Sequence, residues 1–227
     1  MPTEPTPERR VADSLPSASL LAFTGGSLDA FLYLEHGKVF AGAMTGNAVL
    51  TGIAVLSHDR TDFTRHILPI IAFLIGVWIA KLLDNRLRHG VIIGLTAEII
   101  GLTIASFLPR GFPENLFVSF IALLVAYQIT TFRSVDQYSY NSTFITGNLR
   151  TIVDGLYAAF DPAKRPDALR QSRDLGIVVA SFILGAVAGA ILAPRGHNHT
   201  LWLSAVALLI VLGVALHRTR RETRSAS

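Results

Sequence analysis

Three polar side chains inside long apolar stretches are the first candidates for chemistry: Asp29, Glu98 and Gln128. An acid at the centre of a spanning helix costs about 2.5 to 3.5 kcal/mol to insert, so such residues are usually kept for ions, protons or ligands. We therefore expect Asp29 and Glu98 to bind a cation or relay protons, with Gln128 beside the pathway. The structural alternative is that a neutral Glu98 and Gln128 hydrogen-bond neighbouring helices, while Asp29 caps a helix or faces the wet interface.

A short motif occurs twice, at the start of two short apolar segments. It reads Met-Thr-Gly-Asn at 44–47 and Ile-Thr-Gly-Asn at 145–148. Glycine permits a tight turn, and an asparagine cap leaves backbone N–H groups that attract anionic or polar groups at a helix N-terminus. The motif predicts two broken-helix sites near a solute or ion pathway, formed by Thr45, Gly46, Asn47, Thr146, Gly147 and Asn148. The alternative is a pair of helix caps in interfacial loops.

The second short segment also carries a charged face, because Arg150 and Asp154 are four residues apart. This spacing is typical of an amphipathic helix lying in the membrane interface. We therefore expect the segment at 45–57, rather than the one at 146–160, to reach the middle of the membrane.

Enzymatic and metal chemistry find no support in the sequence. The 227 residues include no cysteine, and the pair His197 and His199 has no third ligand at a suitable spacing. The chain also lacks the metalloprotease, hydrolase and phosphate-loop motifs. We expect no metal, no cofactor and no enzymatic activity.

The composition is that of a membrane protein. Hydrophobic residues make up 51% of the chain and charged residues 16%, against about a quarter charged in soluble domains, and the mean hydropathy is +0.47. The net charge of +4 fits basic cytoplasmic loops better than a nucleic-acid surface. Membrane lipids are the expected partners, and no nucleic-acid partner is expected.

The apolar segments predict an all-α polytopic bundle with six long spans and two short helices. A span needs about 20 apolar residues, and two shorter segments, 45–57 and 146–160, are predicted to be re-entrant or interfacial. With both termini in the cytoplasm, six crossings place most of the 20 Lys and Arg residues inside. That bias weakens if both short segments also cross. The six spans are 15–34, 66–83, 91–108, 116–132, 175–193 and 201–216.

The predicted domain is a single membrane unit between two tails. Residues 1–14 are rich in proline, threonine and charge, which is typical of disorder, and residues 217–227 form a basic tail for the inner leaflet. No signal-cleavage pattern follows the first apolar segment, so we expect it to remain as a span.

Two halves, about 15–108 and 116–216, share an order of motifs. Each half has a span, a Thr-Gly-Asn segment and two further spans, and the sequence Phe-Leu-Ile-Gly at 73–76 resembles Phe-Ile-Leu-Gly at 182–185. An odd number of crossings inverts the second half, as in transporters that bind their substrate between repeats. The sequence predicts a small-solute secondary transporter or channel. The alternative is a non-transporting scaffold or a lipid- or protein-binding partner.

The predicted span 175–193 has a face of small residues. It is formed by Gly185 and Gly189 and is extended by Ala186 and Ala190. Such a face allows close helix packing, either inside the bundle or between subunits of a homo-oligomer.

Several of these motifs together resemble the YoaK-like family of bacterial integral membrane proteins, domain-of-unknown-function family 1275. The resemblance rests on Gly-Ser-Leu-Asp-Ala at 26–30, Met-Thr-Gly-Asn at 44–47, Gln128 and Thr-Phe-Ile-Thr-Gly at 143–147. It covers residues 20–216 and departs from the family at Ile129, where the family often has asparagine. It implies a multi-pass protein of the bacterial inner membrane with no established function.

Overall fold

The computed structural model describes residues 14–84, 90–132, 134–135, 138–139 and 145–225. The described chain is helical apart from a two-residue antiparallel pair, β1 (Ser134–Val135) and β2 (Tyr138–Ser139). The predicted all-α class is confirmed. Residues 1–13 of the tail expected at 1–14, and the family-pattern residues Thr143 and Phe144, lie outside the described residues.

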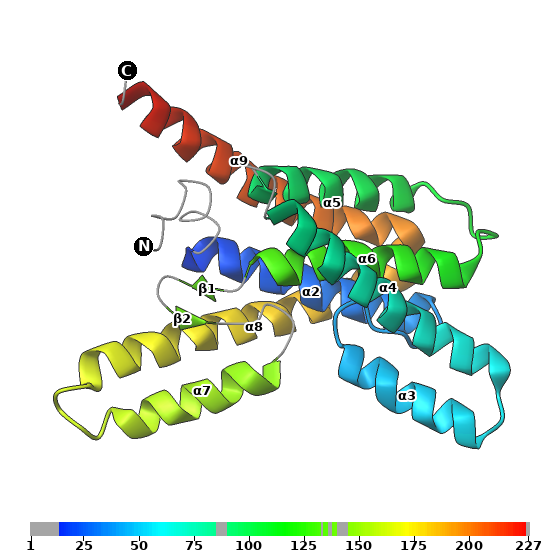
Figure 1. The fold of residues 1–227 in the computed structure, drawn as a ribbon, viewed down its shortest axis with the longest axis horizontal. Helices are drawn as coiled ribbons and strands as arrows, with labels where there is room; N and C mark the ends of the chain where they lie inside the picture. The colour runs from blue at the N-terminus through cyan, green and yellow to red at the C-terminus, as the bar shows by residue number, and fades with distance from the viewer. Residues whose placement is uncertain (1–13, 85–89, 133, 136–137, 140–144, 226–227) are drawn as a thin grey trace.

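The long and short helices follow the predicted order along the chain (Figure 1). Their bounds are α2 (Leu15–Glu35), α3 (Met44–Leu56), α4 (Arg60–Asp84), α5 (Gly90–Ser106), α6 (Glu114–Thr131), α7 (Ile145–Ala158), α8 (Arg165–Gly196), the 3₁₀ turn η1 (His197–Thr200) and α9 (Leu201–Ser225).

Two helices begin well before their apolar segments because polar residues start them. At α4, the Asp59 carboxylate accepts hydrogen bonds from the N–H groups of Thr61 and Asp62 at 2.9 and 3.0 Å. At α8, a proline occupies the first turn and Asp167 adds a negative charge there, both of which favour a helix N-terminus. Hydropathy detects only the apolar part of such helices, so the predicted spans start at 66 and 175 whereas the helices start at Arg60 and Arg165.

By length and apolar composition, three stretches of the described chain can cross a membrane: Arg60–Leu83, Glu114–Thr131 and Arg165–His217. The third contains α8, η1 and the first part of α9, and the chain reverses direction at η1 (Figure 1). Helix α5 is apolar but short, and α2 falls outside the three although it was predicted as the first span. The hydropathy of α2 is lowered by small polar residues that are buried in the bundle, namely Ser17, Thr24, Ser27 and Asp29.

Helix α2 runs through the centre of the molecule and packs along α8 and α9, while α4 packs along α6 (Figure 1). Helix α5 lies against α6 and α9, and each short helix pairs with the long helix that follows it, α3 with α4 and α7 with α8. Large apolar side chains remain exposed on the outer faces, as at Leu74, Trp78 and Leu184. These faces are suited to contact with lipid.

Glycines bring the helix backbones into direct contact. A Cβ atom at Gly26 would overlap with the carbonyl oxygen of Phe182. Likewise, a Cβ atom at Gly185 would overlap with the carbonyl oxygen of Phe23, and one at Gly189 would come within 2.6 Å of the carbonyl oxygen of Ser27. Gly185 and Gly189 therefore pack α8 against α2 inside the chain.

Candidate functional site

A cavity of about 720 Å³ lies where α2 and α8 meet the first residues of α3 and α7. Its polar lining consists of Asp29 and Tyr33 from α2, Thr45 from α3 and Thr146 from α7. The fold thus brings one predicted acid and both Thr-Gly-Asn motifs to one place. The other walls are apolar, with Phe182, Ile183, Ala186, Val187 and Ala190 contributed by α8.

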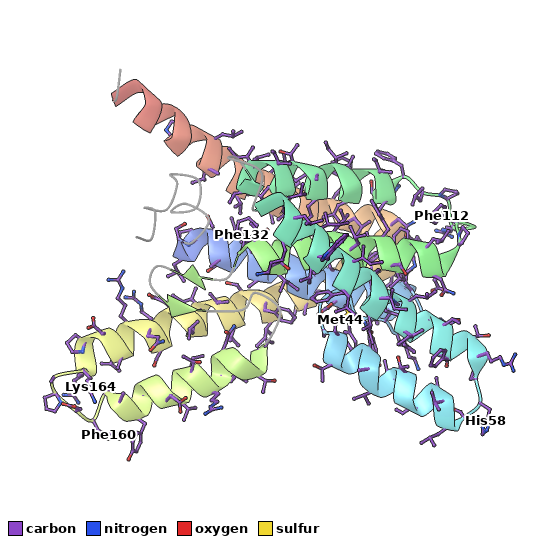
Figure 2. The ribbon with its side chains drawn as sticks, in the orientation of Figure 1. Met44, His58, Phe112, Phe132, Phe160 and Lys164 are labelled. Carbon is purple, nitrogen blue, oxygen red and sulfur yellow. The ribbon has the colours of Figure 1, made fainter. Side chains whose placement is uncertain are left out.

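The two short helices start at this cavity and run away from each other. In Figure 2, α3 runs from Met44 near the middle of the molecule towards His58 at one end, and α7 ends near Phe160 and Lys164 at the opposite end. A helix of 13 or 14 residues is about 20 Å long, too short to cross a bilayer. Because peptide dipoles make a helix N-terminus positive, two partial positive charges face the cavity.

The segment between α2 and α3 folds back towards the middle of α2, where Asp29 holds it. The Asp29 side chain is buried, with 5% exposed, and its Oδ1 atom accepts a hydrogen bond of 2.8 Å from the Gly42 N–H. Asp29 therefore has a positioning contact as well as a place in the cavity wall.

Asn47 does not cap α3, contrary to the sequence prediction. The residue before the helix is Ala43, no side chain caps the first turn, and Asn47 lies inside the helix and is fully buried. Its amide instead pairs with both backbone groups of Phe40: Oδ1 accepts from the N–H at 2.9 Å and Nδ2 donates to the carbonyl at 2.8 Å. Asn148 is likewise a buried residue inside α7 rather than a cap.

The glycines of the motif do not supply the expected turn. Gly46 is helical, and its missing side chain leaves room for the Phe40 ring, which a Cβ atom would meet at 2.8 Å. A Cβ atom at Gly147 would meet nothing within 4 Å among the described residues. The left-handed turn falls instead at Gly37, with a φ of 72°, and Lys38, with a φ of 62°, before the fold-back segment.

The structure does not bring Glu98 and Gln128 to the cavity. Glu98 is 1% exposed, and neither of its oxygens has a hydrogen-bond partner among the described residues. It lies one turn from Gly94 and Gly101, which face Tyr127 and Leu124 of α6. On the next face of α6, Gln128 donates a 3.1 Å hydrogen bond to the Leu21 carbonyl, while its own oxygen has no partner among the described residues.

The amphipathic pair on α7 forms as predicted, but it does not decide the depth of that helix. Arg150 Nε lies 3.7 Å from Asp154 Oδ2, and both side chains are largely exposed. The first turn of α7 nonetheless reaches the same cavity as the first turn of α3 through Thr146 and Thr45. Both short helices therefore reach the cavity by their first turns, whereas the charged face of α7 predicts that only α3 does so.

Sequence reasoning missed Tyr33, Phe40 and most of the α8 wall of the cavity. Two signals were available for that wall. Ala186 and Ala190 belong to the small-residue face noted beside Gly185 and Gly189, and Phe182 and Ile183 belong to the repeated sequence at 182–185. Tyr33 and Phe40 carried no motif. They meet, with ring centroids 5.1 Å apart, only because the segment after α2 folds back.

Comparisons with known proteins agree with this membrane architecture. The model of the DUF1275 family, described as a protein of unknown function, matches residues 17–214. The chain is also 25% identical over 207 residues to the UPF0700 transmembrane protein YoaK of Bacillus subtilis (strain 168), covering 87% of this chain and 91% of that protein. No solved structure matches the chain significantly. The chain is therefore a membrane protein that belongs to the DUF1275 family, whose function is not established.

Proposed function

We propose that this protein is a transporter or channel for a small solute, which binds in the cavity beside Asp29, Thr45 and Thr146. The observation that carries the proposal is the convergence of two short helices, by their N-termini, on a cavity that also contains an acid. Broken helices with N-termini near the middle of the membrane form the substrate sites of many transporters. The role is binding and passage of a solute and includes no enzymatic step.

The proposal includes an inverted internal repeat. The packing of α2 on α8, α3 on α4 and α2 on α9 has its counterpart in α6 on α4, α7 on α8 and α6 on α5. The matching glycines Gly185 and Gly76 also have matching neighbours, since a Cβ atom on either would overlap the backbone of α2 at Phe23 or of α6 at Leu123. These correspondences support two halves of related structure around one site.

The proposal also includes six crossings, with α3 and α7 entering from opposite sides without crossing. It is supported by the opposite positions of the two hairpin tips, at His58 and at Lys164 (Figure 2). Six crossings put both termini on one side, and the basic residues assign that side to the cytoplasm of a bacterial inner membrane.

Cysteine substitution tests the pathway without knowledge of the solute, because the chain has no native cysteine. We expect Thr45→Cys and Thr146→Cys to react with a hydrophilic cationic methanethiosulfonate in proteoliposomes, since a thiol needs water to ionise and react. The matched control is Leu74→Cys, an exposed apolar position on α4 that faces lipid and is expected to stay unreactive. If both cavity cysteines are as unreactive as the control, the cavity is dry and the protein is a non-transporting scaffold.

Asp29→Asn and Glu98→Gln then separate the two acids. We expect Asp29→Asn to reduce solute-dependent flux at least tenfold while the protein still inserts, because Asp29 lines the cavity. Glu98→Gln reports whether the second buried acid couples a proton to the same flux. Full flux with both variants would assign structural roles to both acids.

A further inference from the structure

We propose that the cavity selects an organic cation, such as an amine or quaternary ammonium compound with apolar substituents. This inference rests on the proposed function and names the chemical class of its solute. It depends on three features of the cavity wall: its charge, its aromatic rings and its apolar surface.

The formal charge carried by side chains on the described part of the lining is negative. Asp29 is the one charged side chain among the described residues that line the cavity, and none of these residues is Lys, Arg or His. The Oδ1 atom of Asp29 accepts a hydrogen bond of 2.8 Å from the Gly42 N–H, a contact that favours the ionised carboxylate over the neutral acid. Because Asp29 is itself buried, a cation beside it would be attracted more strongly than by a carboxylate in bulk water.

Two aromatic rings lie on the same wall as the acid. Tyr33 is one turn after Asp29 on α2, and its ring centroid lies 5.1 Å from that of Phe40 with the planes inclined by 32°. Both residues line the cavity. The face of an aromatic ring attracts a cation, and aromatic rings are the usual partners of quaternary ammonium groups.

The remaining wall suits the apolar substituents of an organic ligand. Phe182, Ile183 and Val187 of α8 present apolar side chains to the cavity, and contact with such surface favours carbon groups over a hydrated inorganic ion. A cavity of about 720 Å³ is within the usual range for small organic ligands.

The helix N-termini favour an anion, and this competing effect has to be weighed. At α3 the nearby carboxylate of Asp29 already bonds to the Gly42 N–H, so that end of the cavity holds its own anion. The N-terminus of α7 is left as the competing attraction, and the test below includes an anionic ligand for this reason.

The test compares three ligands of nearly the same shape by isothermal titration of the purified full chain in detergent. Choline is the cation, 3,3-dimethylbutan-1-ol its neutral analogue and 3,3-dimethylbutanoate the anion. We expect choline to bind at least about tenfold more tightly than either analogue, which is a difference in binding free energy of about 1.4 kcal/mol. Equal binding of choline and the neutral alcohol, preferred binding of the anion, or no binding of choline would overturn the inference.

Variants locate the binding. Asp29→Asn and Tyr33→Leu are each expected to reduce the preference for choline to less than threefold, while Tyr33→Phe keeps it. The matched control is Asp154→Asn, which removes an exposed carboxylate from α7 and is expected to leave binding unchanged. An undiminished preference in Asp29→Asn would contradict the proposed site.

Failure of this inference is distinguishable from failure of the proposed function. If Thr45→Cys and Thr146→Cys react with the thiol reagent but choline does not bind preferentially, the water-filled site stands and its assigned ligand class is wrong. If the cavity cysteines are unreactive and none of the three ligands binds, both proposals are wrong.

Discussion

At the scale of single residues, the two hydrogen bonds between the Asn47 side chain and the Phe40 backbone are the most specific contact of the Thr-Gly-Asn motif. The side chain is fully buried and pairs with the N–H and the carbonyl of Phe40. A backbone segment inside a membrane protein must have its polar groups satisfied, and one asparagine satisfies both groups of this residue. The motif therefore fixes the fold-back segment in front of the cavity.

We expect Asn47→Ala to destabilise the protein, because it leaves a donor and an acceptor of Phe40 unpaired in a buried place. The expected loss is about 1 to 3 kcal/mol, measured as a lower midpoint of thermal unfolding in detergent. Asn47→Asp keeps the acceptor for the Phe40 N–H but sets a second oxygen against the Phe40 carbonyl, so it is expected to destabilise the protein at least as much as alanine does. Thr64→Ala, which removes an exposed hydroxyl bonded only to its own helix, is the control. Unchanged stability in Asn47→Ala would show that the pairing contributes nothing.

His36, the residue after α2, provides a second prediction at this scale. Its ring stacks on Phe117 with centroids 4.3 Å apart and an interplanar angle of 17°, and Nε2 lies 3.2 Å from Asn198 Oδ1. Burial lowers the pKa of His36 below its ordinary value of 6.5, and this effect exceeds the opposing effects of the Asn198 hydrogen bond and the charges of Glu114 and Glu35.

A lowered pKa in the folded state means that the unfolded state binds a proton more readily. The stability contributed by neutral His36 is therefore complete above pH 6.5 and is lost as the pH falls below that value towards the folded pKa. We expect the thermal midpoint to fall between pH 7 and pH 5 and the fall to be smaller in His36→Gln. An identical pH dependence in both proteins would assign it to other groups.

At the scale of helices, the contact between α2 and α8 determines whether the cavity exists. Gly26 of α2 lies against the α8 backbone, and Gly185 of α8 lies against the α2 backbone. The cavity opens beside these two contacts, at Ala30, Ala186 and Ala190. Small residues therefore serve twice, first by allowing close packing and then by leaving space for a ligand.

Gly26→Ala is expected to cost about 1 to 3 kcal/mol of stability, the usual cost of overpacking, because its Cβ would overlap with the Phe182 carbonyl and backbone cannot rotate away. Gly176→Ala, on the partner helix α8 and with nothing among the described residues within 4 Å of its Cβ, is the control. That control is expected to be neutral or slightly stabilising, since alanine favours helix more than glycine does. Thermal unfolding in detergent measures both, and equal midpoints would refute the close packing.

At the scale of the whole molecule, the two hairpins point to opposite ends. The α3–α4 turn lies at His58 and the α7–α8 turn at Lys164 (Figure 2). Opposite ends of a bundle that spans a membrane face different compartments, whereas two additional crossings by α3 and α7 would put both turns on one side.

Single cysteines at Arg60 and Arg165 test this arrangement in intact cells with a membrane-impermeant maleimide. Both positions are exposed and start the long helix of their hairpin. We expect the cysteine at 60 to be labelled from outside and the cysteine at 165 to be labelled only after the cells are opened. Labelling of both from one side would contradict six crossings and with them the inverted repeat.

The sequence by itself determined that this protein lies in a membrane, that its fold is all-α and to which family it belongs. The excess of apolar residues, the helical segments and the motifs around Asp29, Thr45 and Gln128 are local properties, so they are readable without knowing any neighbour in space. The bounds of α4 and α8 were predicted less well, because their polar first turns carry no hydropathy signal.

Only the tertiary structure decided which of these residues meet. Thr45 and Thr146 share one cavity with Asp29, whereas Glu98, an equally plausible partner by sequence, lies on the side of α5 that faces α6. Asn47 and Phe40 are paired because the segment after α2 folds back. The physical reason is that hydropathy places a residue in the membrane, while the packing of distant helices determines which side chains it faces there.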